Sequence, residues 1–133
     1  MDNATQIFIV GGMIVLSFGF LLGIPMAVTR SRSPRAPRYL FAAHLAAIIQ
    51  GALLLAMTVA IGFSDLSPGV ETVAATLLLS GIVLFDLGMV INWLQGVEDA
   101  FSEKSLGNKV SSIGTPFVLI GTGIVLFGVI AAI

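Results

Sequence analysis

The sequence has 133 residues, of which 57% are hydrophobic and only 10% are charged, and its mean hydropathy is +1.08. This composition excludes an ordinary water-soluble globular protein. The absence of cysteine excludes disulfides, thiolate catalysis, zinc–thiolate centres and iron–sulfur clusters, and the net charge of −1 indicates no particular partner.

Four apolar runs separated by short polar stretches predict four transmembrane helices. A helix crosses the bilayer core with roughly 20 mostly apolar residues, whereas a strand of a membrane barrel needs only about 10 alternating ones. The runs are too long for such strands. The sequence therefore predicts an all-α, four-helix transmembrane bundle, with residues 1–133 forming a single membrane domain. The expected helices are Ile7–Val28, Tyr39–Phe63, Val70–Leu94 and Ile113–Ile133.

The first expected helix is read as a permanent membrane span. No Lys or Arg precedes it, and it is longer than the apolar segment of a secretory signal. It contains the GxxxG motif Gly19-Phe-Leu-Leu-Gly23, and Gly81 and Gly88 lie two turns apart on the third helix. Small residues at these spacings let helices approach closely within or between protomers. They favour a homo-oligomer.

Basic residues predict the orientation in a cell membrane. Arginines crowd the first connection and lysines occupy the third, so both connections are expected on the cytoplasmic side and both termini outside. The arginines are read as the positive-inside anchor, with anionic lipid as a second interpretation. These basic residues are Arg30, Arg32, Arg35, Arg38, Lys104 and Lys109.

Proline positions predict where helices begin. Pro34 and Pro37 keep the first connection extended. Ser67-Pro68 and Thr115-Pro116 each offer an N-cap followed by proline at the first helical position, which predicts the starts of helices three and four. The third connection, residues 95–112, is then the longest.

Polar residues inside the membrane are the candidates for function, because an ionisable side chain there costs roughly 2.5–3.5 kcal/mol on insertion scales. Helix two carries His44 and Gln50, and helix three carries Asp86 and Asn92. At a rise of about 1.5 Å per residue, all four lie roughly 3–16 Å from the cytoplasmic ends of their helices. They would converge if the two antiparallel helices faced each other.

Each of these residues also has a structural interpretation. His44 could reach the membrane interface or bond a neighbouring carbonyl instead of binding a ligand. Asp86 could be protonated and bonded to a threonine such as Thr58. Gln50 and Asn92 could be hydrogen-bonding contacts between helices, which is the commonest use of amides in membranes.

The presence of a single histidine in the apolar runs favours haem over other metal cofactors. Non-haem iron and zinc need three or more protein ligands, and no second histidine or paired carboxylate lies in the apolar runs. Haem iron needs only one axial imidazole. Small residues beside His44, namely Ala43, Ala47 and Gly51, would admit either a flat macrocycle or another helix, and Met26, Met57 and Met89 are candidate sixth ligands. No hydrolase triad, phosphate loop or nucleic-acid-binding face is present.

Helices two and three resemble the hydroxylaminobenzene mutases. Helix two carries Ala43-His44-Leu45 followed by Gln50-Gly51, and helix three carries Asn92-Trp93-Leu94. These are similar to the paired A-H-L, Asn-Gly and N-W-L motifs of that family of four-helix membrane isomerases, although Gln50 replaces the usual asparagine. A more distant similarity extends to styrene oxide isomerase.

The resemblance implies an intramolecular rearrangement of a small aromatic substrate, either arylhydroxylamine to aminophenol or aryl epoxide to aldehyde. It also implies a haem b trimer with His44 as the axial and metal ligand. Ala47 and Gly51, in the stripe of small residues beside His44, would then lie against the cofactor. Haem iron would act as a Lewis acid on the substrate oxygen. Asn92 and Gln50 would orient the substrate, and Asp86, which has no counterpart in the family motifs, could shuttle a proton.

Two other classes of function remain open. A non-catalytic haem-binding or accessory membrane subunit would co-purify with a partner and convert neither substrate. A transporter or channel would use Asp86 as its coupling site, although a four-helix protomer is small for transport.

Overall fold

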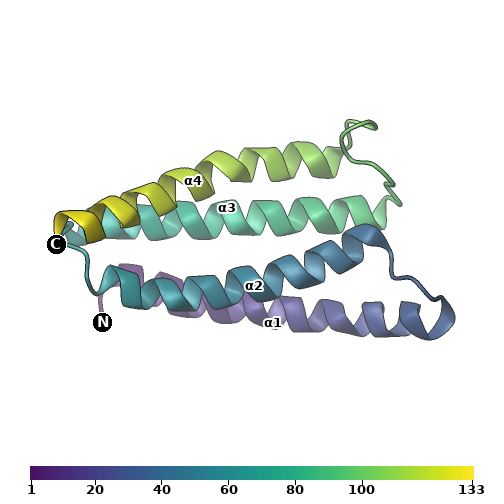
Figure 1. The fold of residues 1–133 in the computed structure, drawn as a ribbon, viewed down its shortest axis with the longest axis horizontal. Coiled ribbons are helices and arrows are strands. Elements are labelled where there is room, and N and C mark those ends of the chain that lie inside the picture. The colour runs from purple at the N-terminus through teal and green to yellow at the C-terminus, as the bar shows by residue number, and fades with distance from the viewer.

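The computed structural model describes all 133 residues and confirms an all-helical chain of four long, apolar, antiparallel helices (Figure 1). Each helix is long and apolar enough to cross a membrane. Both termini lie at one end of the bundle, and the first and third connections lie at the other (Figure 1). The helices are α1 (Asn3–Arg32), α2 (Arg38–Ile61), α3 (Pro68–Leu94) and α4 (Leu106–Ala131).

Local capping explains where α1 and α3 begin. The carboxylate of Asp2 caps α1 by accepting hydrogen bonds from the backbone N–H and the hydroxyl of Thr5, at 2.7 and 2.9 Å. Ser67 is the N-cap residue of α3 and Pro68 is its first residue, as the sequence predicted, although the Ser67 side chain makes no capping bond.

The fourth helix begins earlier than predicted. It starts at Leu106, because the Ser105 hydroxyl caps it by accepting from the Asn108 backbone N–H at 3.1 Å. The prediction that Thr115-Pro116 starts this helix is therefore wrong, and the third connection is residues 95–105. Pro116 lies inside α4, as Pro25 lies inside α1. A membrane helix tolerates an internal proline because neighbouring groups compensate for the lost backbone bond.

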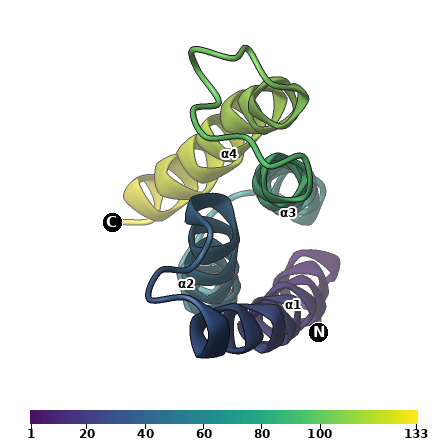
Figure 2. The same cartoon turned by 90° about the vertical axis from the view of Figure 1, so that its right-hand side faces the viewer.

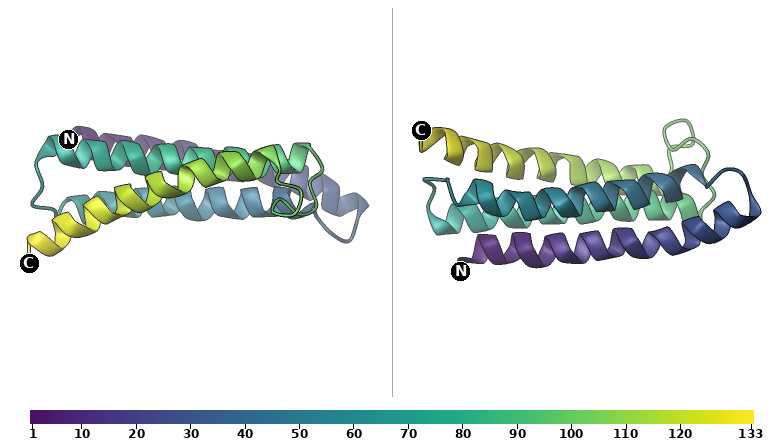
Figure 3. Two further views of the ribbon diagram at one scale, coloured as in Figure 1. Left: turned by 90° about the horizontal axis from the view of Figure 1, so that it is seen from above. Right: turned by 60° about the horizontal axis from the view of Figure 1, so that its bottom comes forward.

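The helices pack as two pairs rather than as a closed four-cornered bundle. α1 lies along α2, and α3 lies along α4, which crosses it obliquely (Figures 2 and 3). α4 touches α2 at only a few positions and does not touch α1. Side chains of α2, α3 and α4 line a groove between α2 and α4, with α3 as its floor.

Glycines on α4 allow the close approach of α3. Gly107, Gly114, Gly121 and Gly128 recur every seven residues, and all four are buried. The first three pack against α3, whereas Gly128 packs against Ser64 and Leu66 in the second connection. A Cβ added to Gly81 of α3 would lie only 2.7 Å from the Gly114 carbonyl oxygen. Seven-residue spacing keeps one face of a helix turned toward its partner in left-handed packing.

The small residues of α1 and α2 also pack against each other. A Cβ at Gly19 would lie 2.9 Å from the backbone nitrogen of Ile48, and a Cβ at Gly51 would lie 2.6 Å from that of Leu16. Ala47 has no exposed surface. Of the two uses open to the small stripe on α2, contact with another helix is therefore the one observed. In the single chain, α1 covers Ala47 and Gly51, the two residues expected beside a cofactor.

Candidate functional site

His44 is held against α1 by a hydrogen bond to the backbone. Its Nδ1 lies 2.7 Å from the carbonyl oxygen of Gly19, and the ring is half-buried. Because a carbonyl oxygen only accepts, this contact assigns the proton to Nδ1. Nε2 makes no hydrogen bond within the chain. In the neutral ring it therefore presents a free lone pair.

The GxxxG motif of α1 provides the space for this imidazole. Gly19 supplies the accepting carbonyl, and a Cβ added to Gly23 would lie 3.3 Å from His44 Cε1. That separation is tight, so a larger residue at position 23 would press on the ring. The motif that predicted close helix contact therefore also fixes the position of the only histidine.

Asn92 joins α3 to the start of α4. It is only 1% exposed, and its Oδ1 accepts a hydrogen bond of 2.7 Å from the Ser105 hydroxyl, which also caps α4. Gly107 lies directly against the Asn92 amide, and any side chain there would collide with it. Asn92 thus has the interhelical role that the sequence left open beside a catalytic one.

Asp86 is buried without a partner. It is 3% exposed, and neither carboxylate oxygen makes a hydrogen bond. It borders a cavity of about 190 Å³ between α1 and α3, whose other lining residues are all apolar. The alternative of a bond to a threonine such as Thr58 is not found, and the Thr58 hydroxyl donates instead to the Leu55 carbonyl at 2.7 Å.

Gln50 faces the groove between α2 and α4. It is half-buried, and its Oε1 has no hydrogen-bond partner. It borders a cavity of about 200 Å³ whose other walls come from α3 and α4, including Phe85 and Thr115. An acceptor without a donor inside an apolar groove would gain from a ligand that carries an N–H or O–H group.

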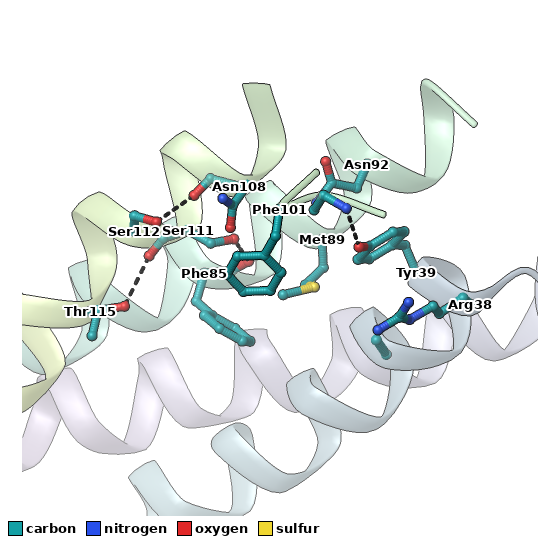
Figure 4. A pocket seen from close by; sticks show the side chains of 12 residues that line it. Arg38, Tyr39, Phe85, Met89, Asn92, Phe101, Asn108, Ser111, Ser112 and Thr115 are labelled. Carbon is teal, nitrogen blue, oxygen red and sulfur yellow. Dashed lines mark hydrogen bonds between the residues drawn. The ribbon is translucent and has the colours of Figure 1, made fainter. Parts of the chain in front are cut away.

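A larger cavity of about 400 Å³ lies in the same groove, at the end that carries the first and third connections (Figure 4). Asn92 borders it, together with aromatic rings from α2, α3 and the third connection and polar side chains from α4. Tyr39 anchors the connection over this end, because its hydroxyl accepts from the Ala100 backbone N–H at 2.8 Å. The rings are Tyr39, Phe85 and Phe101, and the polar α4 residues are Asn108, Ser111, Ser112 and Thr115.

The four candidate residues do not converge within one chain. His44 lies on the α1 side of α2, and Asp86 lies between α1 and α3. Only Gln50 and Asn92 face the same groove, where they border neighbouring cavities that share Phe85 and Thr115. Similar depth on two antiparallel helices was therefore not enough to predict that these residues meet. Each side chain also points in a direction set by the rotation of its helix, and that direction leads to different neighbours.

Sequence reasoning missed most of the residues that form the α2–α4 groove. The sequence predicts Tyr39 at the start of a helix and Asn108 in the third connection. The spacing Ser105-Leu-Gly-Asn108 offered a signal, since a serine N-cap before an apolar helix predicts the earlier start of α4. With that start, the polar residues that follow Ser105 fall on a helix beside the groove.

Comparison of the chain with protein-family models, with curated proteins and with solved structures finds no match. The likeness to hydroxylaminobenzene mutases and styrene oxide isomerase therefore depends on the short motifs of α2 and α3 alone. Membership of that family stays a hypothesis.

Proposed function

We propose that this protein is a membrane-embedded isomerase that rearranges a small aromatic hydroxylamine or epoxide, with haem b bound to Nε2 of His44. The observation that carries the proposal is the bond between His44 Nδ1 and the Gly19 carbonyl. A histidine ligand usually donates its other ring N–H to a carbonyl or carboxylate, which orients the ring and raises its basicity. This bond supports the proposed role of the imidazole as an axial ligand.

A second copy of the chain would complete the haem-binding site. His44 borders none of the larger cavities of the single chain, and α1 already covers Ala47 and Gly51. Phe41 and Leu45, beside His44 in the sequence, are 51% and 44% exposed. A neighbouring protomer would bury these apolar side chains together with the macrocycle. A homo-oligomer, a trimer by resemblance, follows from this proposal.

The candidate residues lie on different faces of one chain, so the proposal requires neighbouring protomers to bring them to one substrate. When bound, haem iron supplies a Lewis acid for the substrate oxygen. Asn92 already accepts from Ser105 through Oδ1, so its amide nitrogen is the group left to donate. Gln50 offers its unpaired Oε1. Asp86, held among apolar side chains, would take a proton from one substrate atom and return it to another. The isomerisation would thus involve no net gain of protons and no net redox change.

The proposal also includes membrane orientation. The Arg-rich end of the bundle is placed in the cytoplasm and both termini outside, because positive charge is retained on the cytoplasmic side.

Two substitutions at His44 separate ligand binding from structure. The Asn amide nitrogen of His44→Asn can replace Nδ1 as donor to Gly19 but provides no Nε2, whereas His44→Ala loses both groups. We expect the wild type to show a Soret band at about 400–430 nm and both His44 variants to lack it. Thr58→Val on the same helix removes only a local bond and should keep the band.

Turnover completes the test. The haem-loaded wild type should convert an arylhydroxylamine to an aminophenol or an aryl epoxide to an aldehyde, and both His44 variants should lose conversion. A wild type that stays colourless after haem is supplied, or a fully active His44→Asn protein, would contradict the proposal.

A non-catalytic accessory subunit is the second candidate, because His44 and Asn92 both take part in hydrogen bonds between elements of the bundle. Such a protein would use these residues for packing alone. It predicts a partner that co-purifies in mild detergent, no conversion of either substrate, and His44→Asn behaving like the wild type.

A further inference from the structure

The groove between α2 and α4 has a polar end and an apolar end. Its two cavities, of about 400 and 200 Å³, share Phe85 and Thr115 and so adjoin each other. From Arg38 to Gln50 along α2, the groove extends about 18 Å at the helical rise of about 1.5 Å per residue. One leaflet of the bilayer core measures about 15 Å. The groove is therefore as long as one acyl chain of one leaflet.

The polar end carries unpaired hydrogen-bond donors and one positive charge. Arg38 borders the larger cavity, and its only hydrogen bond is a long one of 3.5 Å to the Glu98 carbonyl. The Asn108 side chain, also in the lining, makes no hydrogen bond. No carboxylate borders this cavity, although Glu98 borders the adjoining cavity with Arg38 and the Asp99 carboxylate interacts electrostatically with Arg38. The site is thus complementary to an anion that accepts several hydrogen bonds.

The other end of the groove is open to the hydrocarbon of the membrane. Val118 and Leu119 border the smaller cavity, and Leu119 is 67% exposed. Because α2 and α4 touch at only a few positions, nothing in the chain closes the groove from the side. A lipid tail could enter laterally from the bilayer without crossing a polar barrier.

We propose that this groove binds one anionic phospholipid from the leaflet at the Arg-rich end. Arg38 and Asn108 hold its phosphate, and one acyl chain lies between α2 and α4. Arginine matches phosphate with several N–H groups at once, and basic side chains near a membrane surface favour anionic lipid. Four arginines occur in or beside the first connection, but only Arg38 borders the groove. This site is separate from His44 and does not depend on haem. It shares Asn92 and Gln50 with the proposed isomerase, so a bound lipid and the substrate would exclude each other at these two residues.

Tryptophan fluorescence provides the test. Trp93 is the only tryptophan, and it borders a separate cavity of about 310 Å³ that shares Arg38 and Tyr39 with the polar end of the groove. The protein is reconstituted in phosphatidylcholine vesicles containing a minority of brominated phosphatidylglycerol or, in parallel, of brominated phosphatidylcholine. We expect phosphatidylglycerol to quench Trp93 with an apparent affinity about fivefold higher, the factor expected for one basic side chain near anionic lipid.

Matched variants distinguish the groove from general surface charge. Arg38→Gln should abolish the preference for phosphatidylglycerol, whereas Arg35→Gln, in the first connection but outside the lining, should retain it. Thr115→Phe, at the junction of the two cavities, should weaken the preference with all arginines present. Helix content and oligomeric state are measured for each variant.

Three results would overturn the proposal. They are equal quenching by the two brominated lipids in the wild type, equal loss in Arg35→Gln and Arg38→Gln, and relief of quenching by inorganic phosphate. The second would indicate a diffuse basic surface, and the third would indicate a site for a soluble anion.

Discussion

Glycine packing between α3 and α4 leads to a prediction that two neighbouring substitutions can test. A Cβ added to Gly121 would lie 2.8 Å from the Ala74 carbonyl oxygen and 2.9 Å from the Leu78 backbone nitrogen. Both are backbone atoms of α3, so they cannot yield by a change of rotamer. A Cβ added to Gly123, two residues further along α4, would meet nothing within 4 Å.

The matched pair isolates the cost of this contact. Replacing glycine by alanine inside a helix gains about 0.5–1 kcal/mol at either position through backbone entropy. Overpacking a tight contact costs about 1–3 kcal/mol. The propensity gain cancels between the two variants, so Gly121→Ala should be about 1–3 kcal/mol less stable than Gly123→Ala.

Reversible unfolding in mixed micelles, driven by increasing dodecyl sulfate and followed by Trp93 fluorescence and circular dichroism, measures this difference. The wild type gives the reference, and Gly123→Ala controls for helix propensity. Equal free energies of unfolding for the two alanine variants would refute the close α3–α4 packing described above.

Three further predictions concern the ends of the helices. Tyr39→Phe removes the acceptor of the Ala100 N–H, so it should cost about 1 kcal/mol in the same unfolding assay and speed hydrogen exchange of that amide. Ser105→Ala removes both the N-cap of α4 and the partner of Asn92; we expect a loss of about 1–3 kcal/mol that Ser105→Thr largely avoids, and wild-type stability of the alanine variant would contradict this role. Hydrogen bonds from the backbone N–H and the hydroxyl of Thr5 hold the pKa of the Asp2 carboxyl below its ordinary value of 3.8. The cap should therefore be intact above pH 3.8 and be lost as the pH falls through the lower folded value; exchange of the first-turn amides should show this in the wild type and be insensitive to titration at position 2 in Asp2→Asn.

The membrane class and the number of helices follow from the sequence alone. A run of about twenty mostly apolar residues satisfies its backbone groups in lipid only as a helix, so the four runs predicted four helices without tertiary information. Capping chemistry also predicted the start of α3 at Ser67-Pro68. The same rule was wrong at Thr115-Pro116, because Ser105 caps α4 earlier and a membrane helix accommodates Pro116.

Residue identity determined which polar groups lie in the apolar helices, but only the tertiary structure decided what each one contacts. The azimuth of a side chain depends on how its helix rotates and pairs, and a nearly uniform apolar surface gives little indication of either. His44 therefore faces the Gly19 carbonyl, Asp86 faces apolar side chains, and Gln50 and Asn92 face the α2–α4 groove. In a chain that is apolar on almost every side, close contacts between small residues set the pairing, and those contacts appear only when the helices are packed.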